Sequence, residues 1–123
     1  MFWKKSGNEE KVDIQWQTLN TLEQLGSIKK ESHNQPVLIY KHSTRCGISS
    51  MVLNRLEREW SAELNGIKAY YLDLIAFRSV SNSVAELFNV YHESPQAIVI
   101  KDGSVVYHAS HMNISVDALK QFN

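Results

Sequence analysis

Residues 36–50 read PVLIYKHSTRCGISS and contain the single cysteine of the chain. The apolar segment Val37 to Tyr40 is typical of a buried strand in a parallel sheet. From Gly47 to about Leu64, apolar residues recur at the spacing of an amphipathic helix. Cys46 is therefore predicted to lie at the start of a helix that follows a central strand. Unpaired backbone N–H groups and the positive end of the helix dipole favour a thiolate there.

The remaining pattern predicts three further strands, over residues 67–73, 96–100 and 105–108. Asp102–Gly103 forms a two-residue turn between the last two, which therefore pair as a hairpin. Helices are expected from about residue 20 to 28, where Glu23 and Gln24 are placed for a capping box, and from about 115 to 122. A second capping box, over residues 83–86, predicts a helix that starts there. This order indicates an α/β fold with a central mixed four-stranded sheet flanked by helices.

Size and charge restrict the class of protein. The 123 residues suit one domain, which we expect over residues 14–123 after a loosely structured lead-in over residues 1–13. Thirteen basic and thirteen acidic side chains cancel, so no overall field attracts nucleic acid or an anionic membrane. Apolar runs are far shorter than the roughly 20 residues of a membrane helix. An unpaired cysteine and a polar N-terminal region favour a cytoplasmic protein.

The chemistry expected of this chain is centred on Cys46. Arg45, Lys41 and His42 add positive charge near the thiol, and a thiolate is the species that attacks a disulfide. Ser49, three residues further on, can donate its hydroxyl to the sulfur but cannot resolve a mixed disulfide. An external thiol must then complete the reaction. The alternative is that Cys46 is a small buried residue without chemistry.

Other candidate groups have simpler explanations. Ser43 and Thr44 suit a turn or a helix N-cap. The histidines at positions 42, 92, 108 and 111 show no recurring ligand spacing, and only one thiol accompanies them, so no metal site is predicted.

The strand, cysteine and helix in this order resemble the active site of the thioredoxin superfamily, in which Ser49 takes the place of the second cysteine of a C-x-x-C motif. Proteins of this superfamily place a cis-proline beside the thiol, where the preceding backbone pairs with substrate as an added strand. Ser94–Pro95 lies at the matching point of the chain. A trans proline at the start of a strand is the ordinary alternative.

Several separated motifs make the resemblance more specific. The chain is similar to the YtxJ-like monothiol bacilliredoxins in five stretches, residues 40–46, 48–49, 71–78, 92–96 and 106–111. The likeness extends from about Ile14 to the C-terminus. The resemblance implies a cytosolic thioredoxin-like protein without a tightly bound cofactor, whose co-substrate is the low-molecular-weight thiol bacillithiol. It implies that Cys46 removes bacillithiol from protein mixed disulfides. Arg45, Lys41 and His42 would then suit the carboxylates of the malate arm of bacillithiol.

Gly47 departs from related active sites, which often carry proline or serine after the cysteine. Residues 46–49, Cys-Gly-Ile-Ser, are also close to the Cys-Gly-Phe-Ser motif of monothiol glutaredoxins, which hold a [2Fe-2S] cluster. The chain lacks the glycine pair that glutaredoxins place after the hairpin. A third alternative is a non-catalytic adaptor that binds an extended peptide beside Pro95.

Overall fold

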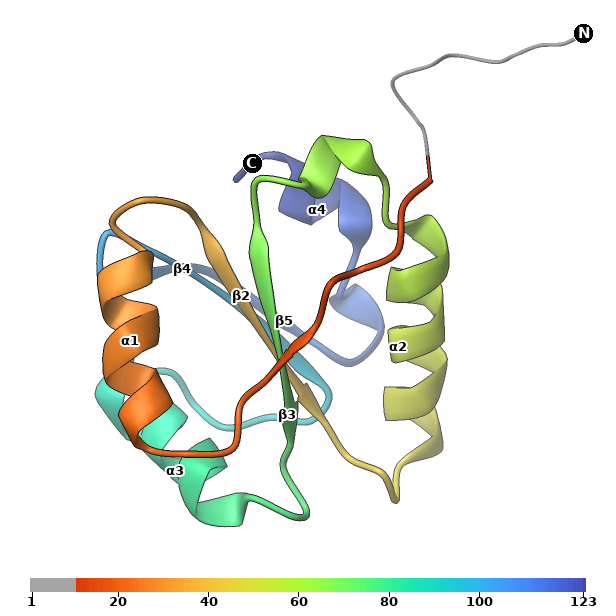
Figure 1. The fold of residues 1–123 in the computed structure, drawn as a ribbon. Helices are drawn as coiled ribbons and strands as arrows, with labels where there is room; N and C mark the ends of the chain where they lie inside the picture. Colours follow the sequence, from red (N-terminus) through yellow and green to blue (C-terminus); the bar gives the residue numbers. More distant parts are fainter. Residues whose placement is uncertain (1–10) are drawn as a thin grey trace, which may run out of the picture.

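The computed structural model describes residues 11–123, so most of the expected lead-in, residues 1–10, lies outside the described residues. Figure 1 shows a central sheet with helices on both sides. The strands are β1 (Gln17–Thr18), β2 (Val37–His42), β3 (Lys68–Asp73), β4 (Gln96–Lys101) and β5 (Ser104–Ser110). The helices are α1 (Glu23–Glu31), α2 (Gly47–Glu59), α3 (Arg78–Leu87) and α4 (Val116–Lys120), with short 3-10 turns η2 (Ala62–Leu64) and η3 (His111–Asn113).

The sheet is mixed and has the strand order β1-β3-β2-β4-β5. Strands β1, β3 and β2 run parallel, whereas β4 is antiparallel to both β2 and β5. The four expected strands are present, and β1 is a fifth that the sequence analysis did not predict. It has only two residues, both exposed, so no apolar alternation marks it in the sequence.

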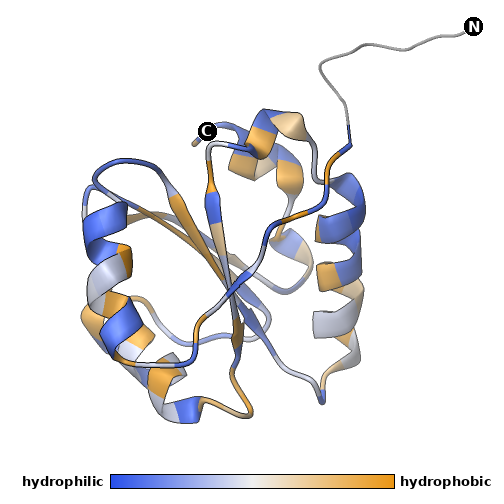
Figure 2. Ribbon diagram, in the orientation of Figure 1, coloured by the Kyte–Doolittle hydropathy of each residue, from blue (hydrophilic) through white to orange (hydrophobic). Residues whose placement is uncertain are grey.

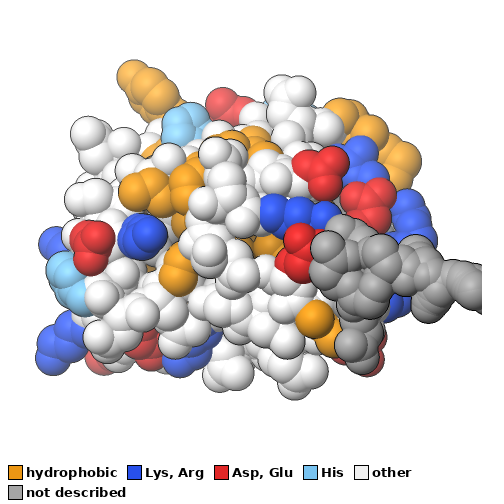
Figure 3. All heavy atoms as spheres, turned by 90° about the horizontal axis from the view of Figure 1, so that it is seen from above, with side chains coloured by type: hydrophobic (Ala, Val, Ile, Leu, Met, Phe, Trp, Pro, Cys, Tyr) orange, Lys and Arg blue, Asp and Glu red, His pale blue; other side chains and the backbone are white. Residues whose placement is uncertain are grey.

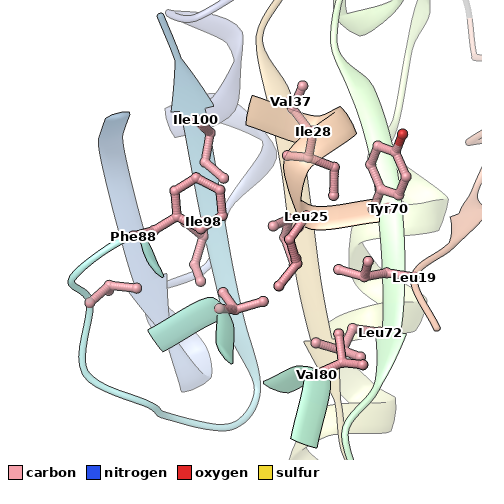
Figure 4. Packing of buried hydrophobic residues seen from close by; sticks show 13 residues of the cluster. Leu19, Leu25, Ile28, Val37, Tyr70, Leu72, Val80, Phe88, Ile98 and Ile100 are labelled. Atoms are coloured by element: carbon pink, nitrogen blue, oxygen red, sulfur yellow. The ribbon is translucent and has the colours of Figure 1, made fainter. Parts of the chain in front are cut away.

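Two apolar clusters hold the helices against the two faces of the sheet. One lies between the sheet and helices α1 and α3 and includes Ile39, Ile98 and Phe88 (Figure 4). The other lies on the opposite face against α2 and α4 and includes Leu38, Leu56 and Leu119. In Figure 2 the central strands are largely orange, whereas the helices alternate between orange and blue along their length. This pattern is expected for strands buried on both faces and for amphipathic helices.

The hairpin and the first capping box are confirmed. Asp102 and Gly103 have positive φ angles of 53° and 82°, which a type I′ two-residue turn requires and glycine adopts without a steric penalty. At the start of α1, the Gln24 Oε1 accepts a hydrogen bond from the Thr21 N–H at 3.0 Å, and the Thr21 Oγ1 accepts one from the Gln24 N–H at 3.3 Å.

Several element boundaries differ from the sequence prediction, and three of them bear on the site. Helix α3 begins at Arg78, so the predicted capping box over residues 83–86 is wrong and Ser83 lies inside the helix. Helix α2 ends at Glu59 because Trp60 is extended, and residues up to Leu64 form the separate turn η2. Strand β2 continues to His42, since its pairing with β3 persists to the partner Asp73. Pairing with β3, which local periodicity does not reveal, decides the end of β2.

Candidate functional site

Cys46 occupies the N-cap position of helix α2, as the sequence predicts. Its backbone is extended, with φ −117° and ψ 118°, and its N–H donates to the Ser43 carbonyl at 3.2 Å. The residue is half-buried and its thiol is unpaired. Cys46 thus lies at the helix end where backbone N–H groups lack intrahelical partners, as the sequence predicts. Cys46 is therefore not fully buried, as exchange with a thiol or disulfide outside the protein would require.

Gly47 leaves open space at the first residue of α2. A Cβ atom built on Gly47 meets no heavy atom within 4 Å. Because glycine loses more backbone entropy on folding than alanine, Gly47→Ala is expected to raise the free energy of unfolding by about 0.5–1 kcal/mol. Urea unfolding of the two proteins measures the change. A lower stability of Gly47→Ala would show that the first turn of α2 requires glycine.

Ser49 is fully buried and bonds within the protein. Its Oγ accepts a hydrogen bond from the Ser43 N–H at 3.0 Å and lies 2.8 Å from His42 Nδ1. From its place in the sequence, the Ser49 hydroxyl could donate to the Cys46 sulfur. In the structure it contacts the end of β2 and the turn that carries the cysteine. The Ser43 Oγ in turn accepts from the Arg45 N–H at 3.3 Å. Ser49 therefore helps to define the shape of the 43–46 turn.

Loss of the Ser49 hydroxyl is expected to be costly. In Ser49→Ala, the buried Ser43 N–H and His42 Nδ1 both lose a partner, so the free energy of unfolding should fall by about 2 kcal/mol. Chemical denaturation checks this value, with the exposed neighbour Ser50→Ala as the control that should change stability little. Equal stabilities of the two variants would contradict the role assigned to the Ser49 hydroxyl.

His42 is buried, and its ring lies close to those of Tyr40 and Tyr71. Burial lowers the pKa of His42 below its usual value, an effect that the Asp73 and Glu57 carboxylates only partly oppose. The lowered pKa favours the neutral imidazole, so burial works against the positive charge that the sequence predicts for His42. Its contribution to the site is the contact with Ser49.

Lys41 is also placed differently from the expectation of a cation beside the thiol. It lies within β2 and is fully buried. Its Nζ donates to the Ser81 carbonyl at 3.1 Å and lies 3.2 Å from His92 Nδ1. This placement on the α3 side of the sheet does not present the ammonium group to a carboxylate in solution. Arg45, by contrast, is exposed and directly precedes Cys46.

Ser94 and Pro95 form a cis peptide bond just before β4. The register pairs Lys41 with Gln96, so Pro95 lies at the end of β2 from which the turn to Cys46 departs. The Pro95 carbonyl accepts from the His111 N–H at 3.0 Å, and the Ser94 Oγ is buried without a hydrogen-bond partner among the described residues. The fold thus brings together the two chain segments that the sequence analysis singled out.

The described residues contain no group of three or more His, Cys, Asp or Glu side chains that could hold a metal ion. Within the same part of the chain, every helix is too short or too polar to cross a membrane. Figure 3 views the molecule from the end away from the 43–46 turn, and on that face Lys and Arg side chains lie among Asp and Glu side chains. That face therefore has no extended surface of one charge.

The fold and the single thiol at the start of α2 define a thioredoxin-like oxidoreductase. Residues 17–119 match the family model of the monothiol bacilliredoxin BrxC, and the chain belongs to this family. A solved structure provisionally described as an oxidoreductase with a thioredoxin fold is 30% identical, with a TM-score of 0.73, and the match covers 86% of this chain and 91% of that one.

Thioredoxins share the fold at lower identity. The thioredoxin of Malassezia sympodialis is 16% identical with a TM-score of 0.73, over 90% of this chain and 94% of that one. The thioredoxin of Trypanosoma brucei brucei is 15% identical with a TM-score of 0.66, over 98% and 93%. These likenesses confirm the predicted fold class.

Proposed function

We propose that this protein removes bacillithiol from protein mixed disulfides through Cys46. The observation that carries the proposal is the single thiol of the chain at the N-terminus of α2, with the buried Ser49 hydroxyl one helical turn away. With no second cysteine, the protein cannot resolve a mixed disulfide internally. Membership of the bacilliredoxin family supports bacillithiol as the external thiol, and the reducing cytoplasm is the expected location.

The proposed reaction has two thiol–disulfide exchanges. In the first, the Cys46 thiolate attacks the bacillithiol sulfur, the protein–bacillithiol S–S bond breaks, and the released protein thiolate takes a proton from solvent. In the second, the thiolate of another bacillithiol attacks the bacillithiol sulfur on Cys46, which yields bacillithiol disulfide and regenerates the Cys46 thiolate. The second bacillithiol is the reductant: its sulfur is oxidised from a thiol to a disulfide while the protein sulfur is reduced from a disulfide to a thiol, so the reaction balances without a cofactor.

Arg45 is proposed to bind a carboxylate of bacillithiol, because it is exposed beside Cys46 while Lys41 and His42 are buried. An exposed ion pair contributes little, so Arg45→Ala is expected to slow bacillithiol transfer by a factor of about 3–5, with the loss diminishing at high salt. Stopped-flow transfer rates at two salt concentrations measure this. An unchanged rate would remove Arg45 from the site.

The direct test mixes the reduced protein with a bacillithiolated test protein and, separately, with the same protein glutathionylated. Intact mass should show gain of one bacillithiol on Cys46, with little transfer of glutathione. A preference for glutathione, or visible absorption of an iron–sulfur cluster after anaerobic reconstitution, would favour the glutaredoxin-like alternative. No transfer from either substrate would favour a non-catalytic adaptor.

A further inference from the structure

Lys41 and Gln96 are two buried polar residues that face each other across strands β2 and β4. They are partners in the antiparallel register and are 0% and 1% exposed. Alternation along the strands puts them on the same face as Ile39 and Ile98, in the cluster against α1 and α3. Polar groups in such a position lower stability unless they are hydrogen-bonded, so their partners indicate what the two side chains do.

Gln96 holds the backbone of the segment that leads to Pro95. Its Nε2 donates to the Tyr91 carbonyl at 2.8 Å, and its Oε1 accepts from the Glu93 N–H at 3.3 Å. Both ends of the amide are therefore bonded to residues 91–93. The contacts fix the path of this segment before it reaches the strand.

Lys41 holds the side chain in the middle of the same segment. Its ammonium group lies 3.2 Å from His92 Nδ1 and donates to the Ser81 carbonyl at 3.1 Å. Because an ammonium group is only a donor, this contact requires His92 Nδ1 to accept and places the His92 ring proton on Nε2. His92 is otherwise exposed, so Lys41 connects a surface side chain to the buried strand beneath it.

The buried positive charge of Lys41 disfavours the folded state. No carboxylate of the described residues forms an ion pair with Lys41. Burial lowers the pKa of Lys41 to about 8. The pKa of His92 is also lowered, by burial and by the positive charges of Lys41 and Arg78, whereas the Glu93 carboxylate raises it. A group whose pKa is shifted by its surroundings, and which has no opposite charge to stabilise it, is a candidate for a role in activity.

We propose that Lys41 is a positioning residue for thiol transfer, which acts through His92 to fix the segment 91–95 beside the turn that carries Cys46. The segment ends at Pro95, at the end of β2 from which that turn departs. A protein disulfide approaching Cys46 then meets a backbone that is already ordered, and less conformational entropy is lost on binding. The inference rests on the proposed function, because it assigns the segment to the binding of a protein substrate.

A double-mutant cycle tests the proposal. Lys41→Met and His92→Leu are each expected to lower the second-order rate of transfer from the bacillithiolated protein about tenfold, and the double variant should lose no more than either single variant. His92→Asn, which keeps an acceptor near the position of Nδ1, should retain most of the rate. Alkylation of Cys46 by iodoacetamide should be unchanged in all four, because the thiol itself is not altered.

Stability separates positioning from a general loss of structure. Lys41→Met should have a melting temperature equal to or above that of the wild type, whereas Ile100→Val, a buried change on the same face, should melt lower yet keep the transfer rate. Three results would overturn the proposal: additive losses of transfer rate in the double variant, an alkylation rate that falls as much as the transfer rate, or the same loss of transfer rate in Ile100→Val.

The thiol that the wild-type protein accepts shows whether this inference or the proposed function has failed. If the wild type takes glutathione rather than bacillithiol, the proposed function fails, and the same cycle run with the glutathionylated protein still decides the role of Lys41. A wild-type protein that accepts neither thiol overturns both.

Discussion

Replacing Cys46 by serine should abolish thiol transfer, with a rate at least about 1000-fold below that of the wild type. The reason is that a thiolate attacks a disulfide sulfur, whereas a serine hydroxyl remains protonated at neutral pH and does not. Because the chain has one cysteine, no other side chain can take over the attack. Intact mass after incubation with a bacillithiolated protein measures the loss directly, since wild-type protein gains one bacillithiol and the variant should gain none.

The neighbouring variant Ser50→Ala is the matched control, because Ser50 is exposed one turn along the same helix and should transfer at the wild-type rate. The same pair of variants tests the adaptor alternative in cells of the source organism. If Cys46→Ser restored the function of a deletion strain as well as Ser50→Ala did, thiol chemistry would not be the purpose of the protein.

The stability of the wild type should rise with pH above about 7.5, because of Lys41. Burial lowers the pKa of Lys41 from 10.5 to about 8. Well below pH 8 the lysine is protonated in both the folded and unfolded states, and the folded state bears the full unfavourable free energy of the buried charge. Between pH 8 and 10.5 the unfolded state binds more protons, so stability increases with pH. The expected gain is about 2 kcal/mol between pH 7.5 and 9.5, out of about 3 kcal/mol overall.

Lys41→Met should lack this rise. At pH 7.5 it is expected to be about 1 kcal/mol more stable than the wild type, because loss of the buried charge outweighs loss of two hydrogen bonds. Denaturant unfolding of both proteins at several pH values between 7 and 9.5 measures the difference. Parallel curves over this range would show that Lys41 does not titrate there, since the other groups that titrate are common to both proteins.

Much of the fold could be predicted from local patterns. Apolar runs identified four of the five strands, and the turn residues Asp102 and Gly103 identified the hairpin. The second capping box failed because the same short polar pattern occurs inside helix α3, where packing against the sheet extends the helix to Arg78. Strand β1 was missed because it forms only by pairing with the edge of β3. β3 is distant in the chain, so no local pattern indicates this pairing.

The candidate site shows the same division. The sequence singled out Cys46, Arg45 and Ser49 as candidates by their order in one segment, but it could not assign their partners. His92 was considered as a metal ligand and as part of the family resemblance over residues 92–96, but not as a partner of Lys41. Gln96 and Ser81 were not recognised as partners of β2 or of its side chains. Lys41 and His92 are 51 residues apart, and a polar residue at the end of an apolar strand is the only signal in the sequence that could have drawn attention to this contact.

Local sequence is enough to show one thiol at the start of a helix after a buried strand, and no second thiol to resolve a mixed disulfide. These features depend on residues close together in the chain. Contacts between distant segments bury Lys41 and His42 instead of presenting them beside the thiol, and they bring Ser49 to His42. This happens because β2 pairs on both sides up to its last residues, which forces successive side chains into opposite faces of the core.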